Sequence, residues 1–77
     1  MDSISNKLLD LHDDVTRRDA VAFRMHVHEL ARRGLYDAEL DGLTRDWSTG
    51  FSEGVWRLVA DRLAVVTQIH YTALGAR

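Results

Sequence analysis

The sequence predicts an all-α fold, a compact bundle of three to four helices that ends in a long C-terminal helix. The chain of 77 residues contains no proline, so nothing in it forbids long helices. Apolar residues recur at spacings of three and four along most of the chain, which is the periodicity of a helix face. No stretch alternates apolar and polar residues over the length of a strand. We expect one helical domain over residues 1–77, because a chain of this length holds at most one domain.

The first 33 residues are predicted to form two helices. One apolar stripe comprises Ile4, Leu8, Leu11 and Val15. The next comprises Ala20, Phe23, Val27 and Leu30. The second stripe is displaced by one residue, which is about 100° around a helix. The displacement favours a chain break near residues 16–19, with Asp19 as a new N-cap, over one helix whose core face rotates. Ser5 is the candidate N-cap of the first helix, and Gly34 the candidate C-cap of the second.

Two further helices follow, and the last is the clearest. A short third helix is predicted from the recurrence of Tyr36, Leu40, Leu43 and Trp47. The fourth begins after the N-cap Ser52, with Phe51 and Trp56 as a hydrophobic staple, and runs to about Leu74 before Gly75. Its main apolar seam comprises Trp56, Val59, Leu63, Val66, His70 and Ala73. The apolar residues beside that seam are Val55, Leu58, Val65 and Ile69.

This breadth of apolar surface on the fourth helix predicts a protein interface, because such a helix needs contacts on two sides. A small chain without cysteine cannot use disulfides, so oligomerisation is an available source of stability. We expect a homodimer built on the fourth helix; a self-contained core and a site for a foreign protein are the alternatives. The expected interface residues are Val55, Trp56, Val59, Leu63, Val66 and His70. The acidic run Asp37, Glu39 and Asp41 is interpreted as a solvated face that can contact a basic partner.

Catalytic, cofactor and metal sites are not expected. The chain has no cysteine nucleophile, no Gly-x-Ser-x-Gly elbow and no glycine-rich phosphate loop. Four histidines invite a metal hypothesis: His12, His26, His28 and His70. However, His26 and His28 are two residues apart and point in different directions on a helix, so they cannot chelate one ion together. We therefore expect no enzyme and no bound cofactor or metal, with a small metal-dependent enzyme kept as a third hypothesis.

The partner is expected to be another protein rather than nucleic acid or membrane. The net charge is −2, and each of the arginine pairs at 17–18 and 32–33 has acidic residues nearby. No apolar stretch approaches the roughly 20 residues of a membrane span, and the N-terminus does not resemble a secretory signal, so we expect a cytoplasmic protein. Size and elimination favour a small regulatory or inhibitory adaptor of bacterial or phage type that occludes a surface of a larger protein. The alternative is a dimeric transcription-associated protein that binds nucleic acid through Arg17, Arg18, Arg32 and Arg33.

Overall fold

A computed structural model describes residues 3–45 and 50–75, and these residues form four helices without a strand. The helices are α1 (Ser3–Arg17), α2 (Ala20–Arg32), α3 (Ala38–Arg45) and α4 (Glu53–Gly75). The predicted all-α class and the long C-terminal helix are confirmed. None of the helices in the described residues combines the length and the apolar character that a membrane-spanning helix needs.

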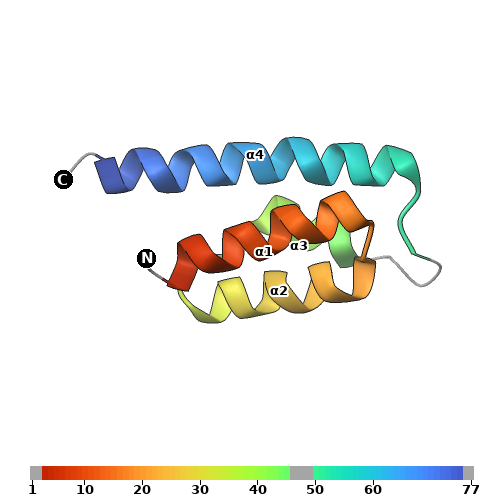
Figure 1. The fold of residues 1–77 in the computed structure, drawn as a ribbon, viewed down its shortest axis with the longest axis horizontal. Coiled ribbons are helices and arrows are strands. Elements are labelled where there is room, and N and C mark those ends of the chain that lie inside the picture. Colours follow the sequence, from red (N-terminus) through yellow and green to blue (C-terminus); the bar gives the residue numbers. More distant parts are fainter. Residues whose placement is uncertain (1–2, 46–49, 76–77) are drawn as a thin grey trace.

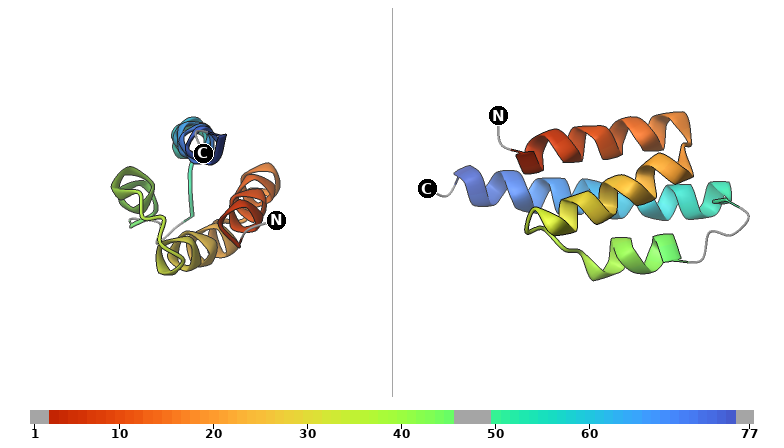
Figure 2. Two further views of the ribbon diagram at one scale, coloured as in Figure 1. Left: turned by 90° about the vertical axis from the view of Figure 1, so that its left-hand side faces the viewer. Right: turned by 90° about the horizontal axis from the view of Figure 1, so that it is seen from below.

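The helices pack in a ring in which neighbours in sequence are neighbours in space, and α4 closes the ring against α1. Helices α2 and α4 therefore lie diagonally across the bundle from each other (Figure 2). Helix α4 runs along the long axis of a bundle that measures 42 × 21 × 20 Å (Figure 1). Because α3 has 8 residues and α4 has 23, α3 covers only part of one flank of α4.

The predicted break between the first two helices is confirmed. Helix α1 ends at Arg17, and Arg18 adopts the left-handed backbone conformation with φ of 57°. The side chain of Asp19 then accepts a hydrogen bond from the backbone N–H of Ala22 at 3.1 Å, which caps α2 as expected. The phase shift of the apolar stripe was therefore the signature of a helix hairpin.

Helix α2 ends as the glycine at position 34 predicts. Gly34 has a φ of 104°, a conformation that glycine adopts without steric cost. Its N–H donates to the carbonyl of Ala31 at 3.0 Å, and the N–H of Leu35 donates to the carbonyl of Leu30 at 3.1 Å. These two bonds form a Schellman motif and satisfy carbonyl groups that the helix end leaves unpaired.

The predicted starts of the first and third helices are wrong. Helix α1 already begins at Ser3, so Ser5 is no N-cap; it is buried, and its Oγ lies 3.2 Å from Nε2 of His70 on α4. The carboxylate of Asp37 accepts the N–H of Leu40 at 2.9 Å, which starts α3 at Ala38 and leaves Tyr36 before the helix. The predicted role of Trp47 lies outside the described residues.

The start of α4 is confirmed. The hydroxyl of Ser52 accepts the N–H of Val55 at 3.3 Å. The rings of Phe51 and Trp56 pack edge to face with centroids 4.8 Å apart, which is the expected staple. The helix continues to Gly75, one residue beyond Leu74.

One hydrophobic core lies at the centre of the ring and receives side chains from every helix. Its buried residues are Leu8 and Leu11 from α1, Phe23, Val27 and Leu30 from α2, Leu40 from α3, and Trp56, Val59, Leu63 and Val66 from α4. Burial of each such side chain is worth about 1.5–3 kcal/mol, so this cluster supplies the main driving force for folding.

Candidate functional site

The structure places four of the six expected interface residues of α4 inside the core. Trp56, Val59, Leu63 and Val66 are at most 4% exposed. They face the other three helices, so the main seam of α4 forms the inner face of the bundle and offers no surface to a second protein. Val55 and His70 are half-buried at the margins of this seam.

The exposed apolar surface of α4 comes instead from the residues beside the seam. Leu58, Val65, Ile69 and Tyr71 are between 44% and 59% exposed. Residues 63–75 contain no Asp, Glu, Lys or Arg, although 29% of the chain is charged. We call the exposed residues of this stretch the uncharged face of α4. They are Ala64, Val65, Gln68, Ile69, Tyr71, Thr72, Ala73 and Gly75.

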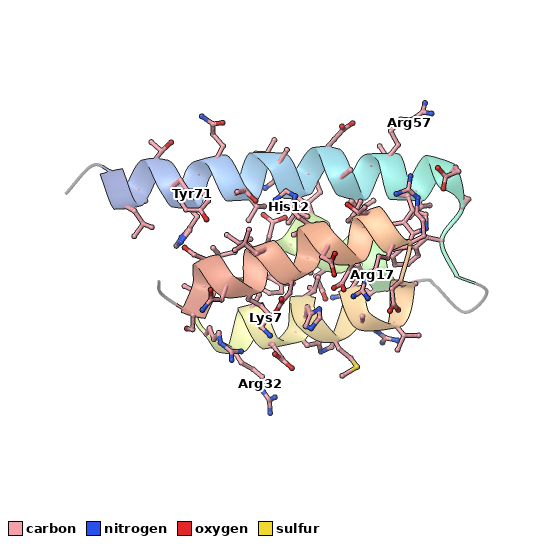
Figure 3. The ribbon with its side chains drawn as sticks, viewed as in Figure 1. Lys7, His12, Arg17, Arg32, Arg57 and Tyr71 are labelled. Carbon is pink, nitrogen blue, oxygen red and sulfur yellow. The ribbon has the colours of Figure 1, made fainter. Side chains whose placement is uncertain are left out.

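Open hollows border the uncharged face on both flanks. The hollow beside α1 has a volume of about 500 Å³ and includes Tyr71, Gln68 and His12 in its lining. Figure 3 shows His12 of α1 and Tyr71 of α4 on this side of the bundle. The hollow beside α3 has a volume of about 420 Å³ and includes Leu43, Leu58 and Val65. A partner on the uncharged face would therefore reach the hollow beside α1, whereas three charged residues also line the hollow beside α3, towards the charged half of the helix.

The N-terminal half of α4 differs because ion pairs tie two of its charged residues, Glu53 and Arg62, to the rest of the bundle. Arg62 donates two hydrogen bonds to the carboxylate of Asp37, at 2.9 and 2.7 Å, and its Nε lies 3.1 Å from Oε2 of Glu39. The guanidinium of Arg62 lowers the pKa of Asp37, and the hydrogen bond from the N–H of Leu40 lowers it further. Asp37 thus fastens α3 to α4 rather than facing a partner.

The rest of the predicted acidic run is also paired within the chain. Asp41 accepts hydrogen bonds from the Tyr36 hydroxyl at 3.2 Å and from Arg45 at 3.0 Å. The guanidinium of Arg45 holds the pKa of Asp41 below its ordinary value. Because Asp37, Glu39 and Asp41 each contact an arginine of the chain itself, they form no unbalanced acidic face.

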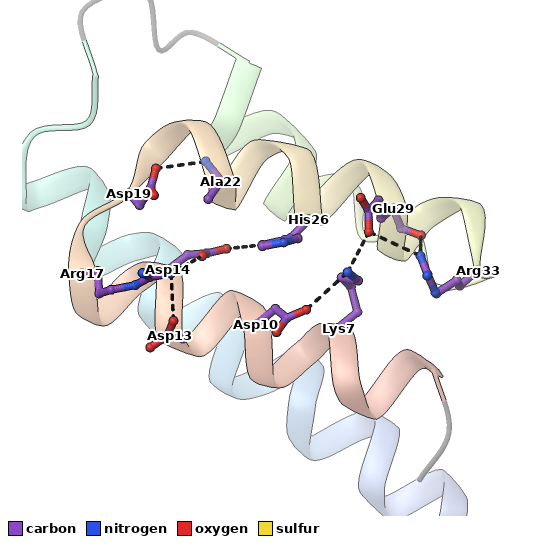
Figure 4. A network of polar contacts seen from close by, with 10 residues as sticks. All are labelled: Lys7, Asp10, Asp13, Asp14, Arg17, Asp19, Ala22, His26, Glu29 and Arg33. Carbon is purple, nitrogen blue, oxygen red and sulfur yellow. Dashed lines mark hydrogen bonds and ion pairs between the residues drawn. The ribbon is translucent and has the colours of Figure 1, made fainter.

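Three histidines connect α1 to its neighbours. Nδ1 of His26 lies 2.5 Å from Oδ2 of Asp14, a carboxylate that is only 1% exposed (Figure 4). His12 donates to the hydroxyl of Thr67 at 2.9 Å, because that hydroxyl gives its own proton to the carbonyl of Leu63. His70 lies beside Ser5, as described above. Each side chain is oriented by a polar partner on a facing helix.

The histidines therefore do not converge on one site. His26 faces α1, whereas His28 is exposed, as their spacing predicted. Among the described residues, no group of three or more His, Asp or Glu side chains is arranged to hold a metal ion. The buried pair of Asp14 and His26 escaped the sequence analysis, although Asp14 follows Leu11 by three residues and so lies next to the core stripe.

A second polar link joins α1 to α2. Nζ of Lys7 lies 2.7 Å from Glu29 and 3.3 Å from Asp10 (Figure 4). The carboxylate of Glu29 raises the pKa of Lys7, and Lys7 in turn lowers the pKa of Glu29. The lysine side chain is 13% exposed, so much of its hydrocarbon stem covers the helix hairpin.

The arginines of the nucleic-acid hypothesis are largely ion-paired. Arg17 lies 2.9 Å from Asp13, Arg18 lies 2.9 Å from Glu53, and Arg33 lies 3.6 Å from Glu29. The guanidinium of Arg18 also stands 5.8 Å from the ring centroid of Trp56, so it fastens the turn between α1 and α2 to the start of α4. Arg32 differs: no carboxylate of the described residues forms an ion pair with it.

The sequence matches no protein-family model, and no curated protein or solved structure resembles it significantly.

Proposed function

We propose that the chain is a small regulatory or inhibitory adaptor that occludes a surface of a larger protein and self-associates through the uncharged face of α4. The observation that carries this proposal is that the C-terminal half of α4 exposes apolar side chains and contains no Asp, Glu, Lys or Arg. Cores of protein interfaces are depleted in charged residues and enriched in aromatic ones. Tyr71, Ile69 and Val65 give this face that composition.

A second copy of the chain is the occupant that suits this face best. In a two-fold interface, residues near the axis meet their own copies, so a charged face would meet like charges there. The uncharged face meets itself without that repulsion. Self-association also adds apolar burial to a chain whose small size leaves a thin stability margin.

A protein is favoured over nucleic acid as the regulated partner. Arg17, Arg18 and Arg33 are paired with carboxylates of the chain, and phosphate contacts would have to displace those partners. The net charge of −2 also opposes long-range attraction to a polyanion.

The test of this function is affinity capture from bacterial lysate with mass spectrometry, at low and high salt and with nuclease. We expect one stoichiometric protein that survives both treatments and whose activity falls when the purified chain is added. Nucleic acid that is recovered alone and lost at high salt would contradict the proposal, because phosphate contacts weaken steeply with salt. A captured protein whose activity the chain leaves unchanged would contradict the regulatory role.

A further inference from the structure

The outer side of α2 carries a second exposed surface with a different composition. We call it the α2 ridge, and it comprises Val21, Arg24, Met25, His28 and Arg32. Val21 and Met25 are 56% and 58% exposed. Arg24, His28 and Arg32 follow one another at intervals of four residues, so their side chains form a line along the helix. The ridge combines exposed apolar groups with two arginines and a histidine, and the neighbouring Glu29, which lines the same hollow, is ion-paired with Lys7.

Two hollows meet along this ridge. One has a volume of about 420 Å³ and is lined by the ridge residues and Glu29. The other lies between α2 and α3, has a volume of about 560 Å³, and includes in its lining Val27, Ala31, Tyr36 and Asp41, whose carboxylate is paired with Arg45. His28 and Arg32 line both hollows, so they stand on the boundary between them. An elongated ligand along α2 would contact His28, Arg32 and the apolar side chains of both hollows together.

Arg32 brings unbalanced positive charge to the ridge. It is exposed and points away from the bundle (Figure 3). Within the described residues it has no ion pair, whereas Arg17, Arg18 and Arg33 each have at least one. A carboxylate that approaches Arg32 therefore gains a bidentate partner without breaking an existing pair.

We infer that the α2 ridge binds an acidic amphipathic helix of the regulated protein. Apolar side chains of that helix would pack on Val21 and Met25, and its carboxylates would pair with Arg32. Methionine adapts to varied apolar partners, and a helix that lays its apolar stripe into a groove is a common recognition mode. This inference rests on the proposed adaptor function and names the chemistry of its partner.

The position of the ridge is compatible with self-association. Helix α2 lies diagonally across the bundle from α4 (Figure 2). A second copy on the uncharged face of α4 would therefore leave both α2 ridges open, and a dimer would present two equivalent binding surfaces. A nucleic acid suits the ridge less well, because the exposed Val21 and Met25 would lie against a charged backbone.

The probe is a labelled helical peptide with leucines at intervals of three and four residues and glutamates on both sides of that stripe. Its binding is measured by fluorescence anisotropy against the full chain and against Arg32→Glu, Met25→Ser and Arg57→Glu. Arg57 is the matched control, because it is also exposed and points away from the bundle on the opposite side (Figure 3). We expect Arg32→Glu and Met25→Ser each to weaken binding about tenfold, and Arg57→Glu to leave it unchanged.

Circular dichroism melting of each variant separates lost binding from lost folding, and all three substitutions are on exposed side chains. No peptide binding by the wild-type chain, or equal losses in Arg32→Glu and Arg57→Glu, would overturn the inference. Tighter binding of a DNA duplex than of the peptide, lost in Arg32→Glu, would overturn it in favour of a nucleic-acid surface. The lysate capture described above decides the adaptor function separately, since it does not depend on the peptide.

Discussion

The two halves of α4 are equally helical but are used differently. The first half is fastened to the bundle by the Ser52 cap, the Phe51–Trp56 staple and the ion pairs of Glu53 and Arg62. The second half begins at Leu63, carries no charged side chain, and contributes only Val66 to the core beyond that point. Its outer side nevertheless exposes Val65, Ile69 and Tyr71.

This contrast separates residues that hold the fold from residues that are free to bind. The inner side chains of both halves are already occupied by the core. In the charged half, Glu53 and Arg62 pair with residues of the bundle, and the exposed charges of Arg57 and Asp61 oppose burial against an apolar partner surface. The uncharged half keeps apolar surface exposed without a structural contact that explains it, which is the pattern of an interface.

The largest loss of stability is expected from a substitution on the inner face of α4, at the point where its two halves meet. Leu63 is fully buried, so Leu63→Asp places a carboxylate in the core without a partner. We expect a loss of roughly 5 kcal/mol or more, which is the whole stability of a small domain. Thermal unfolding followed by circular dichroism measures it, with Arg57→Asp on the exposed side as the control. A cooperative transition at the wild-type temperature would show that α4 is rotated relative to this structure.

A smaller effect is expected from the ion pair that fastens the first half to α3. Arg62 lowers the pKa of Asp37 in the folded chain, so the carboxylate stabilises the fold while it is ionised. That stabilisation is complete above the ordinary pKa of about 3.9 and is lost as the pH falls towards the lower, folded-state value. Arg62→Gln should lower the melting temperature by a few degrees at neutral pH.

The pH dependence provides the control for that substitution. Melting temperatures are compared at pH 7 and near pH 3 for the wild type and for Arg62→Gln. We expect the difference between the two proteins to shrink at the acidic pH, because the unfolded chain then binds a proton at Asp37 and part of the stabilisation by the ionised carboxylate is lost. A difference that is the same at both pH values would exclude Asp37 as the stabilising partner of Arg62.

Removal of the helix cap should have a still smaller effect. Ser52→Ala deletes the acceptor for the N–H of Val55 and should cost about 1 kcal/mol. Ser52→Gly should cost only a few tenths of that amount, because glycine is itself tolerated at an N-cap. Urea unfolding of the two variants checks that Ser52→Ala is less stable than Ser52→Gly. Equal stability of Ser52→Ala and the wild type would mean that the cap does not anchor the first half.

The helices could be predicted from the sequence because their signals are local. The phase shift before Asp19, the glycine at position 34, and the pairing of Phe51 with Trp56 are all readable within a few residues. Ser5 was wrongly predicted to be an N-cap because a serine before an apolar run is typical of one. Its actual surroundings include His70 from the far end of the chain.

The surfaces could be predicted only in part. The width of the apolar band on α4 was visible, but which stripe faces the core depends on the packing of α1, α2 and α3. The acidic run was predicted as a solvated face because its partner Arg62 is 25 residues from Asp37 in the sequence. The absence of charge in residues 63–75 was present in the sequence and becomes informative once Val65 and Ile69 are known to be exposed.

The smallest change in folding stability is expected from aspartate substitutions on the outer side of α4, one of which should abolish self-association. Ile69 is 59% exposed in the uncharged half and Leu58 is 55% exposed in the charged half, so aspartate at either position should change the monomer's stability by less than about 1 kcal/mol. The two substitutions therefore apply the same chemical change to the two halves of one helix.

Sedimentation equilibrium of the wild type, Ile69→Asp and Leu58→Asp tests the central claim most directly. We expect the wild type and Leu58→Asp to sediment as dimers and Ile69→Asp as a folded monomer, because only the last places a charge on the uncharged face. A monomeric wild type at concentrations of hundreds of micromolar, or an Ile69→Asp variant that remains dimeric, would contradict the assignment of this face to a second copy.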